Sequence, residues 1–299
     1  MPTLSEISKY LQLPQPPAQA QRLFHGRGHA YQGLHHVTVD WLPPIALITL
    51  FAPVALPEIE AFAETLLSTL PDCTSVQLQH RYLLSGPIDV IRGDSIQQLT
   101  IHEDNLQFNI SLGKARNTGL FLDMSNGRRW VQQHSQDKRV LNLFAYTCGF
   151  SVAAIAGNAQ SVLNIDMSSA ALNVGRENHR LNRHSLAQVR FEKLDIFKSF
   201  GRIKKRGPFE LLICDPPTLQ KGSVDIARDY PKILRRLDQF MAADATLLLC
   251  LNAPDLSRQF LIEHMAELAP QYRLVDDIKP PEVYAEAEGK GLKVLCFKR

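Results

Sequence analysis

The chain has 299 residues, of which 45% are hydrophobic, with a formal net charge of +3 and five cysteines. This length predicts two domains with a sizeable core, and the mild basic excess permits a nucleic-acid partner without requiring one. The cysteines are scattered, with no CxxC pair and no histidine at metal-ligand spacing, which excludes the common zinc motifs and favours a reducing compartment.

The first 35 residues are predicted to form an extended or partly ordered arm. They contain the proline- and glutamine-rich stretch LQLPQPPAQAQ and show little sustained hydrophobic periodicity. The terminus MPTLSEISKY lacks the basic-then-apolar order of a secretory signal, and prolines interrupt the uncharged run 41–56. We therefore expect a soluble, cytoplasmic protein.

Residues 36–112 are predicted to form a small α+β domain. The stretch VTVDWLPPIALITLF reads as two short strands around Pro43-Pro44, and PEIEAFAETLLSTL has the apolar spacing of a helix. Further short strands are predicted in SVQLQHRY, LTIHED and LQFNISL.

Residues 113–299 have the alternating pattern of an α/β domain. Seven apolar strands separated by helix-like segments are predicted, with the sequences VLNLF, SVLNID, VRFEKLD, FELLICD, ATLLLCL, YRLVDDI and LKVLCFK. This alternation predicts a mostly parallel sheet with helices on both faces. In such sheets ligands bind beyond the carboxyl ends of the strands, where the strand order reverses.

Three successive strands of this sheet end in an aspartate, namely Asp166, Asp195 and Asp215. Asp166 follows Gly149 at nearly the ~20-residue spacing at which an acidic side chain binds an adenosine ribose, and Asp195 could reach an adenine amino group. The alternative is that the aspartates are helix caps, as Asp166 would be for a helix over 168–182. Three carboxylates at successive strand ends favour a shared nucleoside site.

The segment Asp215-Pro216-Pro217 forces a stiff, extended exit from the fourth strand, because proline fixes its own φ and has no N–H. The carboxylate of Asp215 and the carbonyl of Pro216 are therefore candidates to accept hydrogen bonds from the amino or imino groups of a base. The alternative is a strand-terminating turn, which explains the prolines but not the acid before them.

Together, NLFAYTCGF, NIDMS, LDIF and DPPTL resemble the motifs of class I S-adenosylmethionine-dependent methyltransferases. The upstream stretch TGLFLDMSNGRRW is similar to that of bacterial 23S ribosomal RNA base methyltransferases, a group with a cytosine-C5 enzyme and a guanine-N7 enzyme. The resemblance extends from Val37 to the carboxyl terminus. It implies a Rossmann-like methyltransferase sheet preceded by a small domain, S-adenosyl-L-methionine as cofactor and ribosomal RNA as partner. The small domain 36–112 is then a candidate for contacts with RNA. Members usually carry an added RNA-binding module, for which the first 35 residues are too short.

The resemblance also implies roles for individual residues. Asp166 would hold the cofactor ribose, Asp195 its adenine, and the turn 144–149 its methionine part. The cofactor-binding residues implied in this way are Asp123, Phe144, Tyr146, Thr147, Gly149, Asp166, Met167, Asp195, Ile196 and Asp215, with Arg128 or Arg129 near the same pocket. The implied catalytic residues, which would border the target base, are Asp215, Pro216, Pro217 and Asn252.

Two departures from the family pattern affect the expected chemistry. Most members have a glycine pair where this chain has Cys148-Gly149, so a side chain is expected where the cofactor passes the backbone, at a cost in affinity. Cytosine-C5 enzymes attack C6 with a cysteine after the fifth strand, whereas this chain has Asn252 there and Cys250 inside the strand. Guanine-N7 members carry asparagine in that region and a threonine after the double proline, as Thr218 is here. A ring nitrogen such as guanine N7 is therefore the expected target, in preference to cytosine C5.

An exocyclic amine is a weaker candidate, because no aromatic residue follows the double proline to stack on a base, unless Tyr230 or Phe150 substitutes. The basic segment GRIKKRG, with Arg202, Lys204, Lys205 and Arg206, is either a solvated loop or helix end or a phosphate contact. Two other functions stay open. One is a non-catalytic RNA-binding protein on the same fold, and the other is methylation of a protein or a small molecule.

Overall fold

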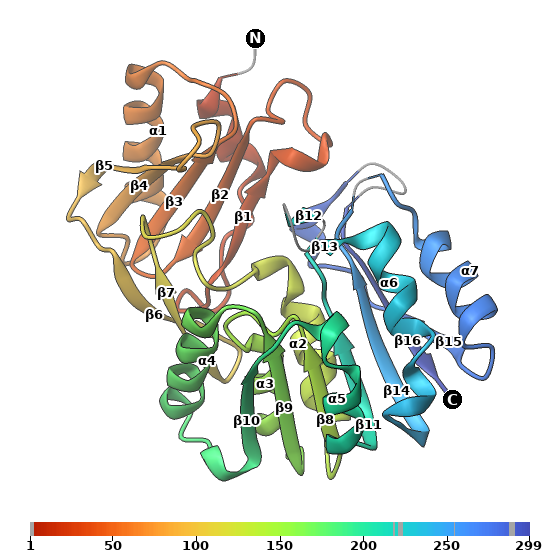
Figure 1. The fold of residues 1–299 in the computed structure, drawn as a ribbon. Helices are drawn as coiled ribbons and strands as arrows, with labels where there is room; N and C mark the ends of the chain where they lie inside the picture. The colour runs from red at the N-terminus through yellow and green to blue at the C-terminus, as the bar shows by residue number, and fades with distance from the viewer. Residues whose placement is uncertain (1–2, 218, 221–223, 254, 287–290) are drawn as a thin grey trace. The chain divides into compact units, whose positions relative to one another are not determined.

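The computed structural model describes residues 3–217, 219–220, 224–253, 255–286 and 291–299, which form two compact units (Figure 1). Unit 1 comprises Met1–Asp123 and Pro281–Glu288, and unit 2 comprises Met124–Pro280 and Gly289–Arg299. The chain therefore leaves unit 1 after residue 123, returns to it at residue 281, and contributes its last strand to unit 2. The predicted boundary at 112/113 lies within unit 1, and residues 36–112 as a separate domain stay a prediction.

Unit 1 contains a five-stranded sheet with the order β1-β2-β3-β4-β5. Its strands are Gln21–His25 (β1), Val37–Leu42 (β2), Ile45–Leu50 (β3), Ser75–His80 (β4) and Ile88–Gly93 (β5). Helix α1 (Leu56–Thr69) connects the parallel pair β3 and β4 and buries Ile59, Phe62 and Leu66 at helical spacing in the unit 1 core. Strands β6 (Gln98–Glu103) and β7 (Leu106–Ser111) form a separate hairpin. The strands and helix predicted in this region are confirmed, and β5 is an additional strand.

Residues 3–34 do not form the arm predicted from the sequence. Leu4–Tyr10 form the 3-10 helix η1, and Gln21–His25 form β1, which pairs antiparallel with β2 at the edge of the sheet. Leu4, Ile7 and Leu23 are buried in the unit 1 core. The sequence does not predict this arrangement, because β1 is short and a 3-10 helix lacks the apolar period of an α-helix. Neither element therefore gives a sustained hydrophobic pattern.

A segment near the carboxyl terminus completes unit 1. It contains the 3-10 helix η7 (Glu282–Tyr284), and the guanidinium carbon of Arg22 in β1 lies 5.0 Å from the ring centroid of Tyr284. The ring centroid of His25 also lies 5.0 Å from that of Tyr284, and Nε2 of His25 lies 3.4 Å from a carboxylate oxygen of Glu286. Residues 281–286 therefore pack with the first strand of the chain.

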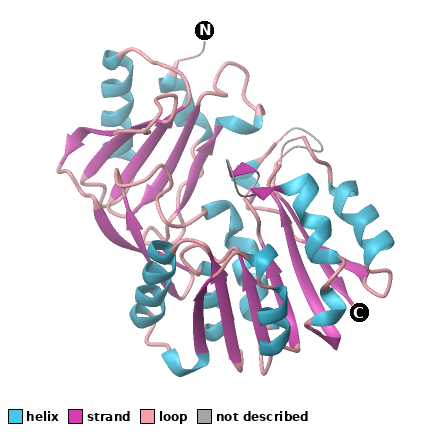
Figure 2. Cartoon of the chain, viewed as in Figure 1, coloured by secondary structure: helices cyan, strands magenta, loops and turns pink. Residues whose placement is uncertain are grey.

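Unit 2 contains a seven-stranded sheet with the order β10-β9-β8-β11-β14-β16-β15, whose strands are labelled in Figure 1 and drawn in magenta in Figure 2. Its strands are Arg139–Leu143 (β8), Ser161–Asp166 (β9), Val189–Lys193 (β10), Phe209–Cys214 (β11), Met241–Leu251 (β14), Arg273–Asp277 (β15) and Lys293–Lys298 (β16). The strands from β10 to β14 pair in parallel, and β16 pairs antiparallel with β14 and β15. All seven predicted strands and the mostly parallel α/β class are confirmed.

Helices cover both faces of this sheet. They are Ser125–His134 (α2), Gly149–Ala156 (α3), Ser169–Leu181 (α4), Phe200–Arg206 (α5), Ile226–Leu234 (α6) and Arg258–Leu268 (α7). Side chains alternate along β8, so that Leu141 and Leu143 join a core with α5, α6 and α7. Asn142 points to the opposite face, toward α3 and α4. Within the described part of the chain, no helix combines the length and the apolar character needed to cross a lipid bilayer.

Candidate functional site

The carboxyl ends of the parallel strands of unit 2 lie along one edge of the sheet. From β8 the chain continues to β9 on one side and later to β11 on the other, so the strand order reverses between β8 and β11. Sheets of this class bind ligands at such a point. Asp166 ends β9, Asp215 follows β11, and Asn252 follows β14. The structure thus brings these predicted site residues to one edge.

The loop between β8 and α3 has an unusual backbone. Phe144, Tyr146 and Cys148 adopt φ angles of 57°, 47° and 63°. Residues with a side chain rarely occupy this left-handed region, at a cost on the order of 1–3 kcal/mol each, and they persist only where surrounding contacts hold them. Such residues gather at ligand sites. Contacts with Asp166 and with helix α4 hold this loop.

Asp166 is one of these supports. Its Oδ2 accepts a hydrogen bond from the backbone N–H of Tyr146 at 2.8 Å, and its Oδ1 accepts one from the backbone N–H of Ser168 at 2.8 Å. Ser168, rather than Asp166, is the N-cap of α4, because its Oγ accepts from the N–H of Ala171 at 3.1 Å. The half-buried carboxylate of Asp166 thus joins the end of β9 to the loop after β8.

Helix α4 is the second support of the loop. Nδ2 of Asn178 donates a hydrogen bond to the carbonyl of Thr147 at 3.0 Å. One turn earlier, Gly175 makes room for Cys148, since a Cβ at position 175 would lie 2.4 Å from Sγ of Cys148. The Cys148 side chain is fully buried and packs with Leu172. Contrary to the expectation from the sequence, this side chain points into the core, because Gly175 leaves a space for it there.

Burial also decides the chemical state of this cysteine. It raises the pKa of the Cys148 thiol well above its usual range, and the nearby charge of Asp166 raises that pKa further. Cys148 is therefore a neutral packing residue.

A buried polar network lies between the sheet and helices α3 and α4. Nδ2 of Asn142 donates to Oδ1 of Asn164 at 2.8 Å, and Nδ2 of Asn164 donates to Oγ of Ser151 at 2.9 Å. Oγ of Ser151 lies 2.8 Å from Nε2 of His179, whose Nδ1 lies 3.1 Å from Nδ1 of His184. Burial, followed by the proximity of His184, lowers the pKa of His179 to about 3. His179 is thus a neutral member of a network that joins β8, β9, α3 and α4.

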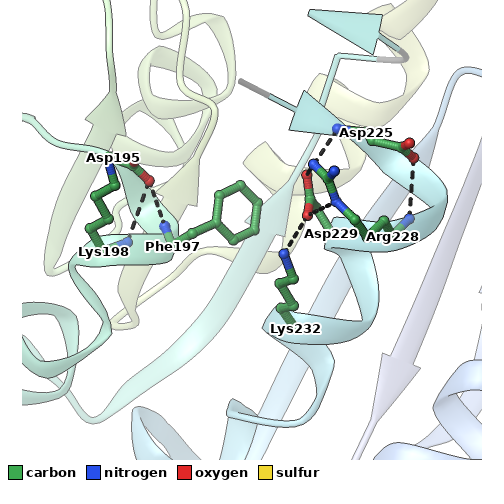
Figure 3. Close-up of polar contacts among 7 residues, drawn as sticks. All are labelled: Asp195, Phe197, Lys198, Asp225, Arg228, Asp229 and Lys232. Carbon is green, nitrogen blue, oxygen red and sulfur yellow. Dashed lines mark hydrogen bonds and ion pairs between the residues drawn. The ribbon is translucent and has the colours of Figure 1, made fainter. Parts of the chain in front are cut away.

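Asp195 caps the short helix that follows β10. Its Oδ1 accepts hydrogen bonds from the backbone N–H groups of Phe197 at 3.0 Å and Lys198 at 3.4 Å (Figure 3). Its Oδ2 lies 3.5 Å from Nζ of Lys198. The ring centroid of Phe197 lies 6.3 Å from that of Phe144, so this turn approaches the loop after β8. The structure therefore shows the capping role of Asp195, and its contact with adenine stays a prediction.

The other predicted cofactor residues differ in exposure. Met167, directly after β9, is 49% exposed, whereas Ile196 is buried. Arg128 is buried on α2, and Arg129 is exposed there. Asp123 belongs to unit 1, and the roles of these five residues stay predictions.

The two predicted catalytic segments leave neighbouring strands. After β11, Asp215 is half-buried, Pro216 is buried and Pro217 is exposed. After β14, Asn252 is exposed, whereas Cys250 is fully buried inside the strand. The exposed polar side chain that follows β14 is therefore an amide and not a thiol.

The aromatic residues considered for stacking on a base lie in the core. Tyr230 is 1% exposed and Phe150 is 8% exposed, so neither can stack on a base in this conformation. Thr218 lies outside the described residues. Among the residues that the structure describes, no group of three or more His, Cys, Asp or Glu side chains is placed to hold a metal ion.

The basic segment belongs to α5. Arg202 and Arg206 each pair with Glu192 of β10 at 2.9 Å. Lys204 and Lys205 are exposed in the last turn of the helix. The helix end expected from the sequence is confirmed, and phosphate contacts by these cations stay a prediction.

Comparisons with known sequences agree on one family. The family described as S-adenosylmethionine-dependent methyltransferase matches residues 21–298. Ribosomal RNA large subunit methyltransferase I of Erwinia tasmaniensis is 28% identical over 279 residues, which cover 87% of this chain and 70% of that protein. The protein of the same name from Aeromonas salmonicida is 27% identical over 226 residues, covering 72% of this chain and 57% of its own length. Ribosomal RNA large subunit methyltransferase K/L of Pseudoalteromonas translucida is 33% identical over 159 residues, covering 52% of this chain and 22% of its own.

Solved structures share the fold. SMU.776, solved in complex with SAH, aligns with a TM-score of 0.87 at 20% identity, covering all of this chain and 82% of that one. The tRNA m1G37 methyltransferase of M. jannaschii aligns with a TM-score of 0.61 at 15% identity, covering 87% of this chain and 71% of that one. At these identities the likeness shows the architecture alone.

Proposed function

Because the chain belongs to the S-adenosylmethionine-dependent methyltransferases, we propose that it methylates a base of ribosomal RNA. The enzyme class and the cofactor, S-adenosyl-L-methionine, follow from the family. The acceptor is the proposal, and the observation that carries it is the similarity to a ribosomal RNA large subunit methyltransferase across 87% of this chain.

The edge of the sheet at β8, β9 and β10 fits this cofactor. The half-buried carboxylate of Asp166 and the exposed Met167 lie next to a loop whose left-handed backbone is held from two sides. Asp166 would hold the ribose hydroxyls, Asp195 the adenine, and the turn 144–149 the methionine part. When bound, the cofactor supplies an electrophilic methyl group on a sulfonium.

On the acceptor side, the carboxylate of Asp215 and the carbonyl of Pro216 would accept hydrogen bonds from the amino and imino groups of the base. These contacts would fix the ring and leave a ring nitrogen free to attack. Guanine N7 needs no general base, because its lone pair is already available. Catalysis then comes mainly from proximity and orientation, which contribute up to ~7–11 kcal/mol in well-oriented reactions.

We favour a ring nitrogen over cytosine C5 for a reason based on the cysteines. Methylation at C5 requires a thiolate that adds to C6. Cys214 and Cys250 are fully buried in β11 and β14, and burial raises the pKa of the Cys214 thiol well above its usual range. The exposed residue after β14 is Asn252, which cannot form the adduct. These observations support direct displacement without a covalent enzyme intermediate.

The test is nucleoside mass spectrometry of ribosomal RNA from the source organism with and without this gene. We expect the loss of one methylated species, 7-methylguanosine, and its return when the gene is restored but not when the Asp215→Ala variant is supplied. Loss of 5-methylcytidine would overturn the role given to Asn252. If no nucleoside changes, ribosomal RNA is not the acceptor, and a protein or a small molecule takes its place.

A further inference from the structure

Helix α6 places a tyrosine between the two strand ends that carry Asp215 and Asn252. The side chain of Tyr230 is 1% exposed. Its hydroxyl lies 3.2 Å from the carbonyl oxygen of Cys214 and 3.2 Å from that of Cys250. Cys214 is the last residue of β11, and Cys250 is the penultimate residue of β14. One side chain therefore contacts both strands where they leave the sheet.

The position of this hydroxyl follows from the register of the two strands. Cys214 pairs with Leu249, which is the last pair of the β11 and β14 ladder. Beyond this pair, β14 continues against β16 alone, as far as the pair Leu251 and Lys293. The Tyr230 hydroxyl contacts both strands at the point where their ladder ends.

Strand β16 anchors the chain on the other side of Asn252. Lys293 is buried, and its Nζ donates a hydrogen bond to the carbonyl of Ala253 at 3.0 Å. Backbone carbonyls before and after Asn252 are thus held by side chains, while the Asn252 side chain itself is exposed. An exposed amide on an anchored backbone has a defined position, as a group that contacts a ligand needs.

Contacts at the start of α6 fix the helix that carries Tyr230. The buried carboxylate of Asp229 accepts hydrogen bonds from the backbone N–H of Asp225 at 2.9 Å and from Arg228 at 2.9 Å, and Nζ of Lys232 lies 2.7 Å from it (Figure 3). The hydrogen bond with Arg228 is the largest cause that holds the pKa of Asp229 well below its usual range. The helix is therefore tied at its first turn, one residue before Tyr230.

We propose that Tyr230 is a positioning residue that sets the separation between the Asp215 segment and Asn252, and so orients the acceptor base. The role in orienting a base rests on the proposed function. The bracing of the two segments is a property of the backbone and can be measured without RNA.

The test compares Tyr230→Phe with Tyr272→Phe in the full chain. Both changes remove one buried phenol oxygen from the same core. Tyr272 precedes β15 at the opposite edge of the sheet, where Arg273 pairs with Lys298 and Lys298 pairs with Thr246. Tyr272→Phe therefore repeats the chemical change away from the proposed site.

Three measurements distinguish positioning from stability alone. Hydrogen exchange followed by mass spectrometry should show faster exchange at Asp215 and at residues 251–253 in Tyr230→Phe only. With ribosomal RNA from cells lacking the gene, kcat of Tyr230→Phe should fall by about tenfold, the equivalent of one hydrogen bond, and the Kd for S-adenosylhomocysteine should stay within about twofold. Lys293→Met tests the second anchor in the same way and serves as the variant if Tyr230→Phe does not fold.

The outcomes separate the two proposals. If exchange and kcat of Tyr230→Phe match those of Tyr272→Phe, the tyrosine has a merely structural role and the inference is refuted. Equal losses in kcat and in S-adenosylhomocysteine affinity would also refute it, because the effect would not be confined to the acceptor side. If the wild-type protein methylates no RNA, the proposed function fails, and the exchange comparison alone decides whether Tyr230 braces the two segments.

Discussion

Gly175→Ala should weaken cofactor binding through a clash beneath the loop after β8. The added Cβ would lie 2.4 Å from Sγ and 2.8 Å from Cβ of Cys148, and 3.2 Å from the carbonyl oxygen of Thr147. Because carbon atoms do not approach this closely, either α4 or the loop must move. Overpacking of this kind costs about 1–3 kcal/mol. If the loop moves, the Kd for S-adenosylhomocysteine should rise by about 5- to 150-fold.

The second change, Cys148→Gly, should restore most of this affinity. It removes the two closest atoms and leaves only the carbonyl oxygen of Thr147, at 3.2 Å from the new Cβ. Glycine also suits the φ of 63° at position 148. The double variant should therefore show a coupling energy of about 1–3 kcal/mol, opposite in sign to the cost of Gly175→Ala.

Titration calorimetry with S-adenosylhomocysteine measures this cycle directly. The matched control is Gly201→Ala on α5, since a Cβ there would meet no atom within 4 Å. The control should bind like the wild type. The reasoning is refuted if Gly175→Ala also binds like the wild type, or if the two changes add without rescue.

Three further predictions concern other positions. Asp215→Ala should abolish methyl transfer to RNA and leave S-adenosylhomocysteine binding nearly intact, and equal losses of both would contradict its acceptor role. Asp166→Ala should weaken S-adenosylhomocysteine binding through the loss of one or two hydrogen bonds to a charged group, at ~1.5–3 kcal/mol each. An unchanged affinity in calorimetry would contradict its cofactor role. His179, whose pKa is lowered to about 3, should destabilise the fold in acid. Because its folded-state pKa lies below the unfolded value of ~6.5, its contribution is complete above about pH 6.5 and is lost toward pH 3, at up to ~1.4 kcal/mol per pH unit. In denaturant unfolding, the free energy of unfolding of His179→Gln should fall less steeply over that pH range than that of the wild type. Equal slopes for the variant and the wild type would argue against this assignment.

The sheet of unit 2 was predictable because its strands are compact apolar runs that end in polar residues. The order of these runs along the chain also predicted a mostly parallel sheet, and Asp166, Asp215 and Asn252 lie at its carboxyl edge as a consequence. Strand β1 escaped prediction because QRLFH is a short segment whose burial depends on β2 and on Tyr284, a residue distant in sequence. The sequence pattern within a short strand does not indicate which distant residues will pack against it.

Side-chain direction was harder to predict than position. The sequence placed Cys148 in the loop after β8, but only the contact with Gly175 on α4 shows that its thiol points inward. The sequence left Asp166 as a candidate cap of α4, and the structure shows that the hydroxyl of Ser168 fills that role. The hydroxyl of Tyr230 contacts two backbone carbonyls, 16 and 20 residues away. Every residue has a backbone carbonyl, so no residue type in the sequence indicates these contacts.

The return of residues 281–286 to unit 1 has a consequence for how the protein is made. A ribosome delivers these residues only after most of unit 2 has emerged, yet Tyr284 and Glu286 contact Arg22 and His25 of β1. Unit 1 therefore stays unfinished while unit 2 is synthesised, and β1 lacks those neighbours until near the end of translation. A fragment that stops at residue 123 would lack them permanently. The final steps in the folding of the first-made unit must accordingly occur after most of the other unit has been translated.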